Sequence, residues 1–152
     1  PEADILEVAR SIYPPDDLCG KIRNFAKLRK QEIISSKESA GLISVRLLSA
    51  LLNEACELYM QGISSIEDID RTMRISLGLR FGPFEVADKI GIDRVLRWMD
   101  NLYSEFGDKK FKASPLIRRL VRAKQLGRAA GRGFYIYNGN GKRMNNRLFN
   151  KV

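Results

Sequence analysis

The stretch that decides the fold runs from Gly41 to Gly62 and reads GLISVRLLSALLNEACELYMQG. Its apolar residues recur every three or four positions, a spacing that suits one face of a helix and not a strand. No proline interrupts it, and a glycine stands at each end. The residues expected on the apolar face are Ile43, Leu47, Leu51, Ala55 and Leu58, flanked by Leu48, Leu52 and Tyr59. The sequence therefore predicts a long central helix, which could be a core helix, one wall of a site or a dimer seam.

Signals for helix starts and ends recur in the residues that follow. Ser64-Ser65-Ile66-Glu67 has the order of a capping box, in which side chains satisfy free backbone N–H groups at a helix start. Proline in a first turn and glycine after a last turn mark further boundaries. The expected helices are 66–77 (with Ile66, Ile69, Met73 and Leu77 buried), 83–90, 93–106 (capped by Asp93) and 115–126 (closed by Gly127). The predicted class is an all-α bundle of about five core helices over residues 40–137, with a short helix and strand before it.

Residues 1–39 are expected to form a linker, or the remnant of a preceding α/β domain. The expected elements are a helix over residues 1–13 ended by Pro14-Pro15, a helix over 18–30 capped by Asp16-Asp17, and a strand over 32–35. One strand is too little to form a sheet, so this extension would pack on the helical domain or stay partly loose.

The end of the chain combines aromatic and basic residues. Phe134, Tyr135 and Tyr137 are expected to anchor it on the bundle, with the tyrosine hydroxyls at the surface. Residues 138–152 are expected to form a mobile basic tail.

Composition narrows the possible functions. The chain contains no histidine, which removes the commonest general base and metal ligand, and no metal site is expected. Its net charge of +9 suits a solvated basic face or a polyanionic small molecule, and no nucleic-acid motif accompanies it, so no nucleic-acid partner is expected. No apolar run reaches the roughly 18 residues that span a membrane. Cys19 and Cys56 are expected to be buried thiols in a reducing cytoplasm. The absence of an initiator methionine suggests a segment of a longer chain.

Five short motifs follow one another between residues 41 and 137. They are Gly41-Leu42-Ile43 with Arg46; Asn53-Glu54-Ala55; Gly62 with Glu67-Asp68-Ile69-Asp70; Gly82-Pro83-Phe84-Glu85-Val86-Ala87-Asp88 with Gly91 and Asp93; and Leu126-Gly127-Arg128 with Gly131 and Gly133-Phe134-Tyr135-x-Tyr137. Each motif alone is weak, but together, in this order and at this spacing, they resemble the C-terminal helical domain of the 3-hydroxyacyl-CoA dehydrogenase family.

The resemblance implies a larger parent enzyme. In this family an N-terminal Rossmann domain binds NAD and carries the catalytic histidine, while the helical domain closes over the acyl-CoA and supplies a homodimer interface. The reaction is the reversible oxidation of an L-3-hydroxyacyl-CoA to the 3-ketoacyl-CoA in fatty-acid metabolism. This segment has neither a glycine-rich phosphate loop nor a histidine, so we expect no catalytic residue and no cofactor site in it, and no activity from it alone.

The resemblance also implies a set of substrate contacts. The candidates are Arg46, Asn53, Phe81, Gly82, Pro83 and Phe84. A structural ion pair, with Glu54 or with a neighbouring helix, is the favoured role of Arg46. A hydrogen bond to backbone at a helix joint is the favoured role of Asn53. The aromatic pair at residues 81 and 84 could line an acyl pocket or pack at a tight joint.

Two positions depart from the family pattern. Val45 stands where the family usually has an asparagine that faces the substrate, and Ala129-Ala130 replace a Lys-Thr-like pair. These departures are similar to the second helical copy in family members that carry two. The alternative interpretation is therefore an architectural dimerisation module that does not bind CoA.

Overall fold

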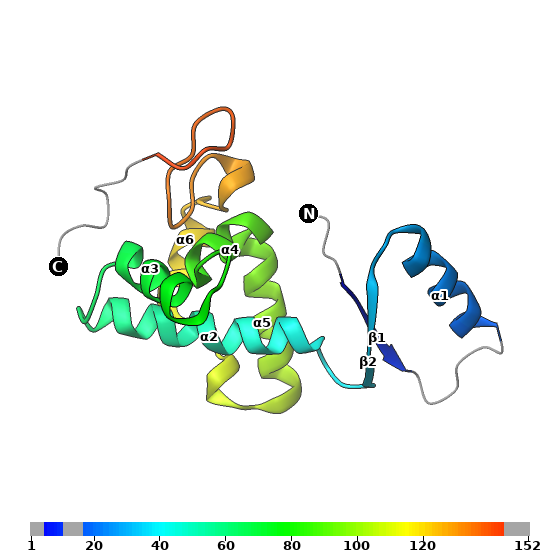
Figure 1. The fold of residues 1–152 in the computed structure, drawn as a ribbon. Helices are drawn as coiled ribbons and strands as arrows, with labels where there is room; N and C mark the ends of the chain where they lie inside the picture. Colours follow the sequence, from blue (N-terminus) through cyan, green and yellow to red (C-terminus); the bar gives the residue numbers. More distant parts are fainter. Residues whose placement is uncertain (1–4, 11–16, 145–152) are drawn as a thin grey trace. The chain divides into compact units, whose positions relative to one another are not determined.

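A computed structural model describes residues 5–10 and 17–144 of the chain (Figure 1). The chain forms two compact units, residues 1–46 and residues 47–152. The first contains two strands and a helix, and the second is built from helices.

The first unit is a strand–helix–strand motif. Strand β1 (Ile5–Arg10) and strand β2 (Glu32–Lys37) pair in parallel, with Ile5 opposite Glu32 and Arg10 opposite Lys37. Helix α1 (Leu18–Leu28) lies between them in the sequence. Parallel strands cannot be joined by a tight turn, so the chain crosses from one strand to the next through a helix, as α/β domains do.

This motif corrects the expected N-terminal helix. Residues 5–10 form a strand, and β2 therefore has a partner and makes a sheet. The apolar positions in residues 5–10 suit either element, and only pairing with β2 decides for the strand. The rest of that predicted helix and the Pro14-Pro15 stop lie outside the described residues. Helix α1 is confirmed, although Asp17 makes no side-chain capping bond.

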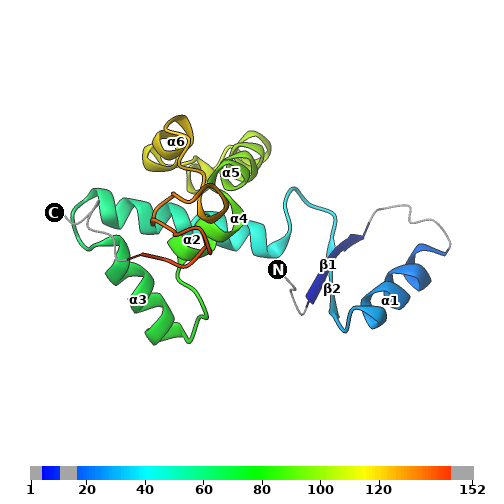
Figure 2. The same cartoon turned by 90° about the horizontal axis from the view of Figure 1, so that it is seen from above.

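The second unit confirms the predicted bundle. Its helices are α2 (Ile43–Met60, which begins at the end of the first unit), α3 (Ile66–Leu77), α4 (Pro83–Ile90), α5 (Ile92–Phe106) and α6 (Pro115–Arg122), with short 3-10 turns η1 (Lys109–Phe111) and η2 (Arg128–Ala130). Helices adjacent in the sequence pack on each other from α3 to α6. In the view of Figure 2, α3 lies on one side of α2, and α5 and α6 lie on the other.

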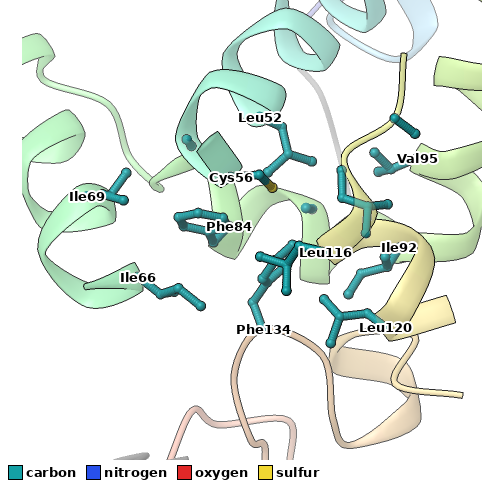
Figure 3. Packing of buried hydrophobic residues seen from close by; sticks show 14 of the residues in the cluster. Leu52, Cys56, Ile66, Ile69, Phe84, Ile92, Val95, Leu116, Leu120 and Phe134 are labelled. Carbon is teal, nitrogen blue, oxygen red and sulfur yellow. The ribbon is translucent and has the colours of Figure 1, made fainter. Parts of the chain in front are cut away.

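The core gathers around two phenylalanine rings (Figure 3). Phe84 of α4 and Phe134 near the C-terminus are almost fully buried, and their ring centroids are 4.7 Å apart. Every helix of this unit contributes to the core, through Leu52, Ala55, Cys56, Ile66, Ile69, Ala87, Ile92, Val95, Met99, Leu116, Ile117 and Leu120. Residues after the last helix therefore complete the core of the bundle.

The buried face of α2 differs from the expected stripe. The residues that the core covers are Ser49, Leu52, Asn53, Ala55 and Cys56. Leu47 is 68% exposed and Ile43 is 45% exposed, although both belong to the expected apolar face. In α3, Leu77 was expected inside and is 63% exposed. Periodicity finds an apolar face, but it does not tell which side of a widely apolar helix meets the core.

Several predicted boundaries shift by a few residues. Helix α5 starts after Gly91, so Asp93 lies in its first turn and is not its cap. Helix α6 ends at Arg122, well before Gly127. Cys19 is exposed, so only Cys56 is a buried thiol, and burial raises the pKa of Cys56 to about 12.

The N-cap of α3 is Ser65, and mutation can test this assignment. Ser65, and not Ser64, precedes the helix, and its Oγ accepts a hydrogen bond from the backbone N–H of Asp68 at 3.1 Å. We expect Ser65→Ala to lower the free energy of unfolding by about 1 kcal/mol, as loss of an N-cap does. Ser64→Ala is the matched control and should change it by less than about 0.5 kcal/mol. Urea denaturation followed by the fluorescence of the single tryptophan, Trp98, measures both, and equal losses would contradict this assignment.

Candidate functional site

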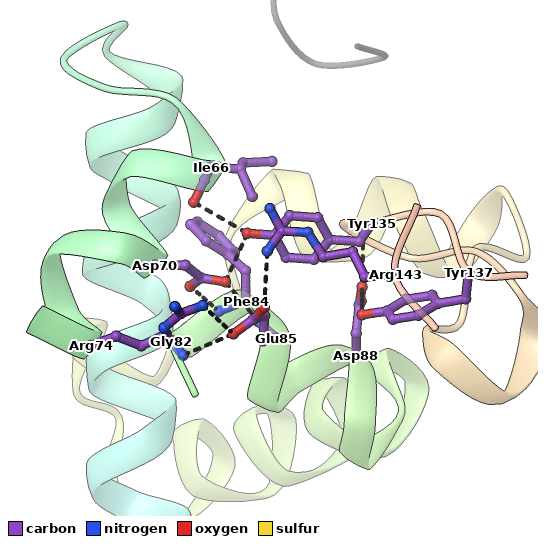
Figure 4. Close-up of polar contacts among 10 residues, drawn as sticks. All are labelled: Ile66, Asp70, Arg74, Gly82, Phe84, Glu85, Asp88, Tyr135, Tyr137 and Arg143. Carbon is purple, nitrogen blue, oxygen red and sulfur yellow. Dashed lines mark hydrogen bonds and ion pairs between the residues drawn. The ribbon is translucent and has the colours of Figure 1, made fainter. Parts of the chain in front are cut away.

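Asp88, a buried carboxylate of helix α4, accepts hydrogen bonds from the C-terminal segment 127–144 (Figure 4). Asp88 is 1% exposed. Its Oδ1 accepts from the backbone N–H of Phe134, and its Oδ2 accepts from the backbone N–H of Tyr135 and from the hydroxyl of Tyr137, all at 2.9 Å. Three donors converge on one ionised acceptor, which is the strongest class of hydrogen bond in proteins.

A second buried carboxylate holds the other end of α4. Asp70 of α3 accepts from the backbone N–H groups of Phe84 at 2.9 Å and Glu85 at 3.0 Å, where α4 begins. Its Oδ2 also accepts from the hydroxyl of Tyr135 at 2.8 Å. A negative charge at a helix start is favourable because the first N–H groups have no partner within the helix. Asp70 therefore joins α3, α4 and the C-terminal segment.

These contacts correct the expected position of two tyrosine hydroxyls. The hydroxyls of Tyr135 and Tyr137 point inward to carboxylates and not to the surface. Asp88 was not among the functional residues predicted from the sequence. A signal existed, because Asp88 follows Phe84 by four residues and so shares its inward face of the helix.

The C-terminal segment is also more ordered than the expected tail. Arg143 Nη1 lies 2.8 Å from Glu85 Oε1, and its guanidinium stands 3.9 Å from the ring centroid of Tyr135. The backbone N–H of Met144 donates to the carbonyl of Ile136 at 2.8 Å. Residues 138–144 are therefore part of the folded unit, and the remainder of the expected tail lies outside the described residues.

Gly82 and Gly133 stand at positions where any larger residue would collide with a buried carboxylate. A Cβ on Gly133 would lie 2.1 Å from Asp88 Oδ1, and a Cβ on Gly82 would lie 2.3 Å from Asp70 Oδ1. Real Cβ atoms do not approach oxygen so closely. Each buried carboxylate thus reaches its backbone donors through a space that only glycine leaves open.

Both carboxylates should titrate above their usual range. Burial raises the pKa of Asp70 and of Asp88 to about 6, and the donated hydrogen bonds offset only part of this rise. The unfolded chain releases these protons near pH 4, so between about pH 4 and 6 the folded unit holds protons that the unfolded chain does not. The stability that these groups contribute is therefore greatest in acid and falls as the pH rises through 6.

Asp88→Asn tests this sign, because asparagine does not titrate. We expect the loss of unfolding free energy caused by Asp88→Asn to be larger at pH 4.5 than at pH 7, by about 2 kcal/mol. Urea denaturation at the two pH values measures the difference. A loss that is smaller at pH 4.5 would show that the three donors outweigh burial and hold the pKa of Asp88 low.

The predicted substrate contacts fall into two groups by burial. Arg46 and Phe81 are half-buried, and Arg46 Nη1 donates to Ser39 Oγ at 3.2 Å. Gly82, Pro83 and Phe84 are buried where α4 begins. The structure brings residues 81–84 together at one joint, and it places Asn53 elsewhere in the helical unit.

Asn53 connects α2 to the loop before α6. Its Nδ2 donates to the carbonyls of Lys110 at 2.7 Å and Lys112 at 3.0 Å, and its Oδ1 accepts from the backbone N–H of Ser114 at 3.1 Å. The favoured role, a hydrogen bond to backbone at a helix joint, is confirmed.

We searched the described residues for a metal site, a dinucleotide-binding turn and a membrane-spanning helix. Among residues 5–10 and 17–144, no three histidine, cysteine, aspartate or glutamate side chains cluster as metal ligands would. The sequence between β1 and α1 contains no glycine, so it does not fit the turn that holds a dinucleotide pyrophosphate. In the same described ranges, no helix has the length and apolar character required to cross a bilayer.

The decisive observation is a match over most of the helical unit. The model of a protein family described as "3-hydroxyacyl-CoA dehydrogenase, C-terminal domain" matches residues 41–137. The chain belongs to the 3-hydroxyacyl-CoA dehydrogenase family. The family region begins just before α2 and ends at Tyr137, so it includes Asp70, Asp88 and residues 127–137 of the C-terminal segment.

Individual 3-hydroxyacyl-CoA dehydrogenase relatives agree with this assignment. A 3-hydroxybutyryl-CoA dehydrogenase of Clostridioides difficile is 44% identical over 105 residues, which cover 69% of this chain and 37% of the relative. One from Bradyrhizobium diazoefficiens is 35% identical over 140 residues, which cover 91% of this chain and 47% of the relative. The chain thus spans about half the length, or less, of these relatives.

Solved structures of the 3-hydroxyacyl-CoA dehydrogenase family share the fold. The crystal structure of (S)-3-hydroxybutyryl-CoA dehydrogenase PaaH1 from Ralstonia eutropha superposes with a TM-score of 0.79 at 34% identity. The match covers 89% of this chain and 48% of that chain. The strand–helix–strand motif and the helical bundle are therefore both features that are found in this family.

Proposed function

We propose that this chain is the substrate-covering and dimerisation domain of an NAD-dependent 3-hydroxyacyl-CoA dehydrogenase. The parent would oxidise an L-3-hydroxyacyl-CoA to the 3-ketoacyl-CoA in fatty-acid metabolism. The observation that carries the proposal is the family match over residues 41–137. NAD would bind to a Rossmann domain elsewhere in the parent, since the sequence between β1 and α1 contains no glycine.

The burial of the predicted contacts suggests how they would divide the work. Phe81 would touch the acyl-CoA, because its side chain keeps exposed surface. Arg46, which belongs to the first unit, stays a predicted contact. The buried residues Gly82, Pro83 and Phe84 would hold Phe81 in place, because Asp70 fixes the backbone at the start of α4. Asn53 would act in the same indirect way, by fixing residues 110–114.

Exposed apolar side chains support a homodimer. Leu47 of α2 is 68% exposed, and Ile75 and Leu77 of α3 are 73% and 63% exposed. Apolar side chains that are exposed to this extent are candidates for a protein interface. We propose that a second copy covers Leu47.

Calorimetric titration of the chain with acetoacetyl-CoA and with CoA tests the substrate role. We expect acetoacetyl-CoA to bind more tightly than CoA, and Phe81→Ala to weaken the binding of both ligands. Phe25→Ala, at a 48% exposed phenylalanine of α1, is the matched control and should leave the binding of both unchanged. We expect no NADH formation from the chain alone. Equal binding of the two ligands would contradict an acyl contact on this domain.

Sedimentation of the same samples distinguishes a substrate-covering domain from the second candidate function, a module that only dimerises. Val45 cannot form the side-chain hydrogen bond of the family's usual asparagine, which favours a module that only dimerises. A dimer that Leu47→Gln dissociates, without any binding of acetoacetyl-CoA, would establish that role. A monomer at high concentration would contradict the dimer in both versions.

A further inference from the structure

A small pocket in the helical unit is lined mainly by positive charge. Its volume is about 240 Å³. The cations Lys89, Arg128, Lys142 and Arg143 line it together with one carboxylate, Glu85. They come from α4, from η2 and from the end of the described chain, so tertiary folding alone brings them together.

The single carboxylate does not neutralise the pocket. Glu85 already pairs with Arg143 at 2.8 Å and with Arg74 at 3.8 Å. Lys89, Arg128 and Lys142 form no ion pair with any carboxylate within residues 5–10 and 17–144. Three positive charges therefore face one small space without a counter-charge from the described chain, which favours an anionic ligand.

The backbone that carries these cations is well fixed. Asn138 closes the turn before Lys142, because its Oδ1 accepts from the backbone N–H groups of Asn140 at 3.1 Å and Lys142 at 2.9 Å. Gly141 lies beside Arg128, and a Cβ at this glycine would be 2.9 Å from Arg128 Nε. The Arg128 guanidinium thus lies against a hydrogen-bonded turn, whose contact restricts it before a ligand binds and so reduces the entropy lost on binding.

Aromatic rings complete the lining. Lys89 Nζ is 4.6 Å from the ring centroid of Phe81, and the hydroxyl of Tyr137 is held by Asp88 at 2.9 Å. Both rings line the pocket. Cations beside aromatic rings suit a ligand that carries phosphates on a flat ring system. Pockets that enclose a whole drug-sized ligand measure roughly 300–1,000 Å³, so this one would take one end of a larger molecule or a small nucleotide.

We propose that this pocket binds the phosphorylated end of a nucleotide. Two sources have this chemistry: a free nucleotide, and the nucleotide end of a CoA thioester. The second source rests on the proposed function. In either case Lys89, Arg128 and Lys142 contact the phosphates, and the rings of Phe81 and Tyr137 contact the base or the sugar.

Calorimetric titration with 3′-phosphoadenosine 5′-diphosphate tests the pocket without any acyl group. We expect Lys89→Gln/Lys142→Gln to weaken binding about tenfold or more, since two charge-assisted contacts are lost. The matched control, Arg119→Gln/Arg122→Gln on α6, removes the same charge from exposed positions outside the pocket and should change binding less than about twofold. All four side chains are exposed, so both variants should fold, and the Lys142→Gln single variant should show a smaller loss in the same direction.

Equal weakening in the two double variants would overturn the proposal, because it would show attraction by net charge alone. Absence of binding, or equal binding of adenosine or of inorganic phosphate, would also overturn it. Tighter binding of 3′-phosphoadenosine 5′-diphosphate than of ADP, with displacement by CoA, would identify CoA as the source. Tighter binding of ADP would identify a free nucleotide. These results do not depend on the difference between acetoacetyl-CoA and CoA, so either proposal can fail alone.

Discussion

Asp88→Ala should lower the free energy of unfolding of the helical unit by about 3 kcal/mol. The reason is the loss of one acceptor that serves three buried donors, the N–H groups of Phe134 and Tyr135 and the hydroxyl of Tyr137. A buried donor left without a partner costs about 1–3 kcal/mol, and relaxation of the segment recovers part of the sum. Urea denaturation followed by Trp98 fluorescence measures the loss, and hydrogen exchange should show the N–H groups of residues 134 and 135 losing protection.

Two further variants show whether the acceptor is responsible. Asp88→Asn keeps the volume but offers only one acceptor oxygen, so at pH 7 it should still cost about 2 kcal/mol. Asp100→Asn removes a carboxylate that pairs with Arg118 at the surface, and it should cost less than about 1 kcal/mol. If Asp88→Asn were as stable as the unmodified chain, the carboxylate would not be what fastens the C-terminal segment.

Gly133→Ala should be at least as damaging, with a loss of about 3–4 kcal/mol. The added Cβ would lie 2.1 Å from Asp88 Oδ1 and 2.6 Å from the Cα of Gly127, so both the carboxylate and the neighbouring backbone would have to move. Phe134, the next residue, would be pulled from its contact with Phe84. We expect a lower midpoint of urea denaturation. We also expect stronger fluorescence of dyes that bind apolar surface, because part of the core becomes exposed.

Gly139→Ala is the matched control for this glycine. It lies in the same segment, and a Cβ there would have no heavy atom within 4 Å. Its effect should stay within about 0.5 kcal/mol. Equal losses of unfolding free energy at the two positions would show that replacing any glycine in this segment destabilises it. That result would contradict the steric role of Gly133.

Local sequence signals were sufficient to predict an element when the interactions that stabilise it lie within a few residues. The apolar repeat of residues 43–60 and the Pro83-to-Gly91 boundaries predicted their helices, because turn-by-turn spacing and capping act over a few residues. The same logic failed for residues 5–10, since a strand is stable only with a partner, and the partner lies at residues 32–37.

The sequence by itself determined the helical class, the order of the helices, the aromatic anchor at Phe134 and Tyr135, and the family resemblance. Only the tertiary structure decided which side of α2 is buried, that Asp70 and Asp88 hold the two ends of α4, and that Lys89, Arg128 and Lys142 line one pocket. The physical reason is range. Helix periodicity and caps depend on neighbours three or four residues away, whereas a buried carboxylate finds its donors up to 65 residues along the chain, and no local pattern encodes that meeting.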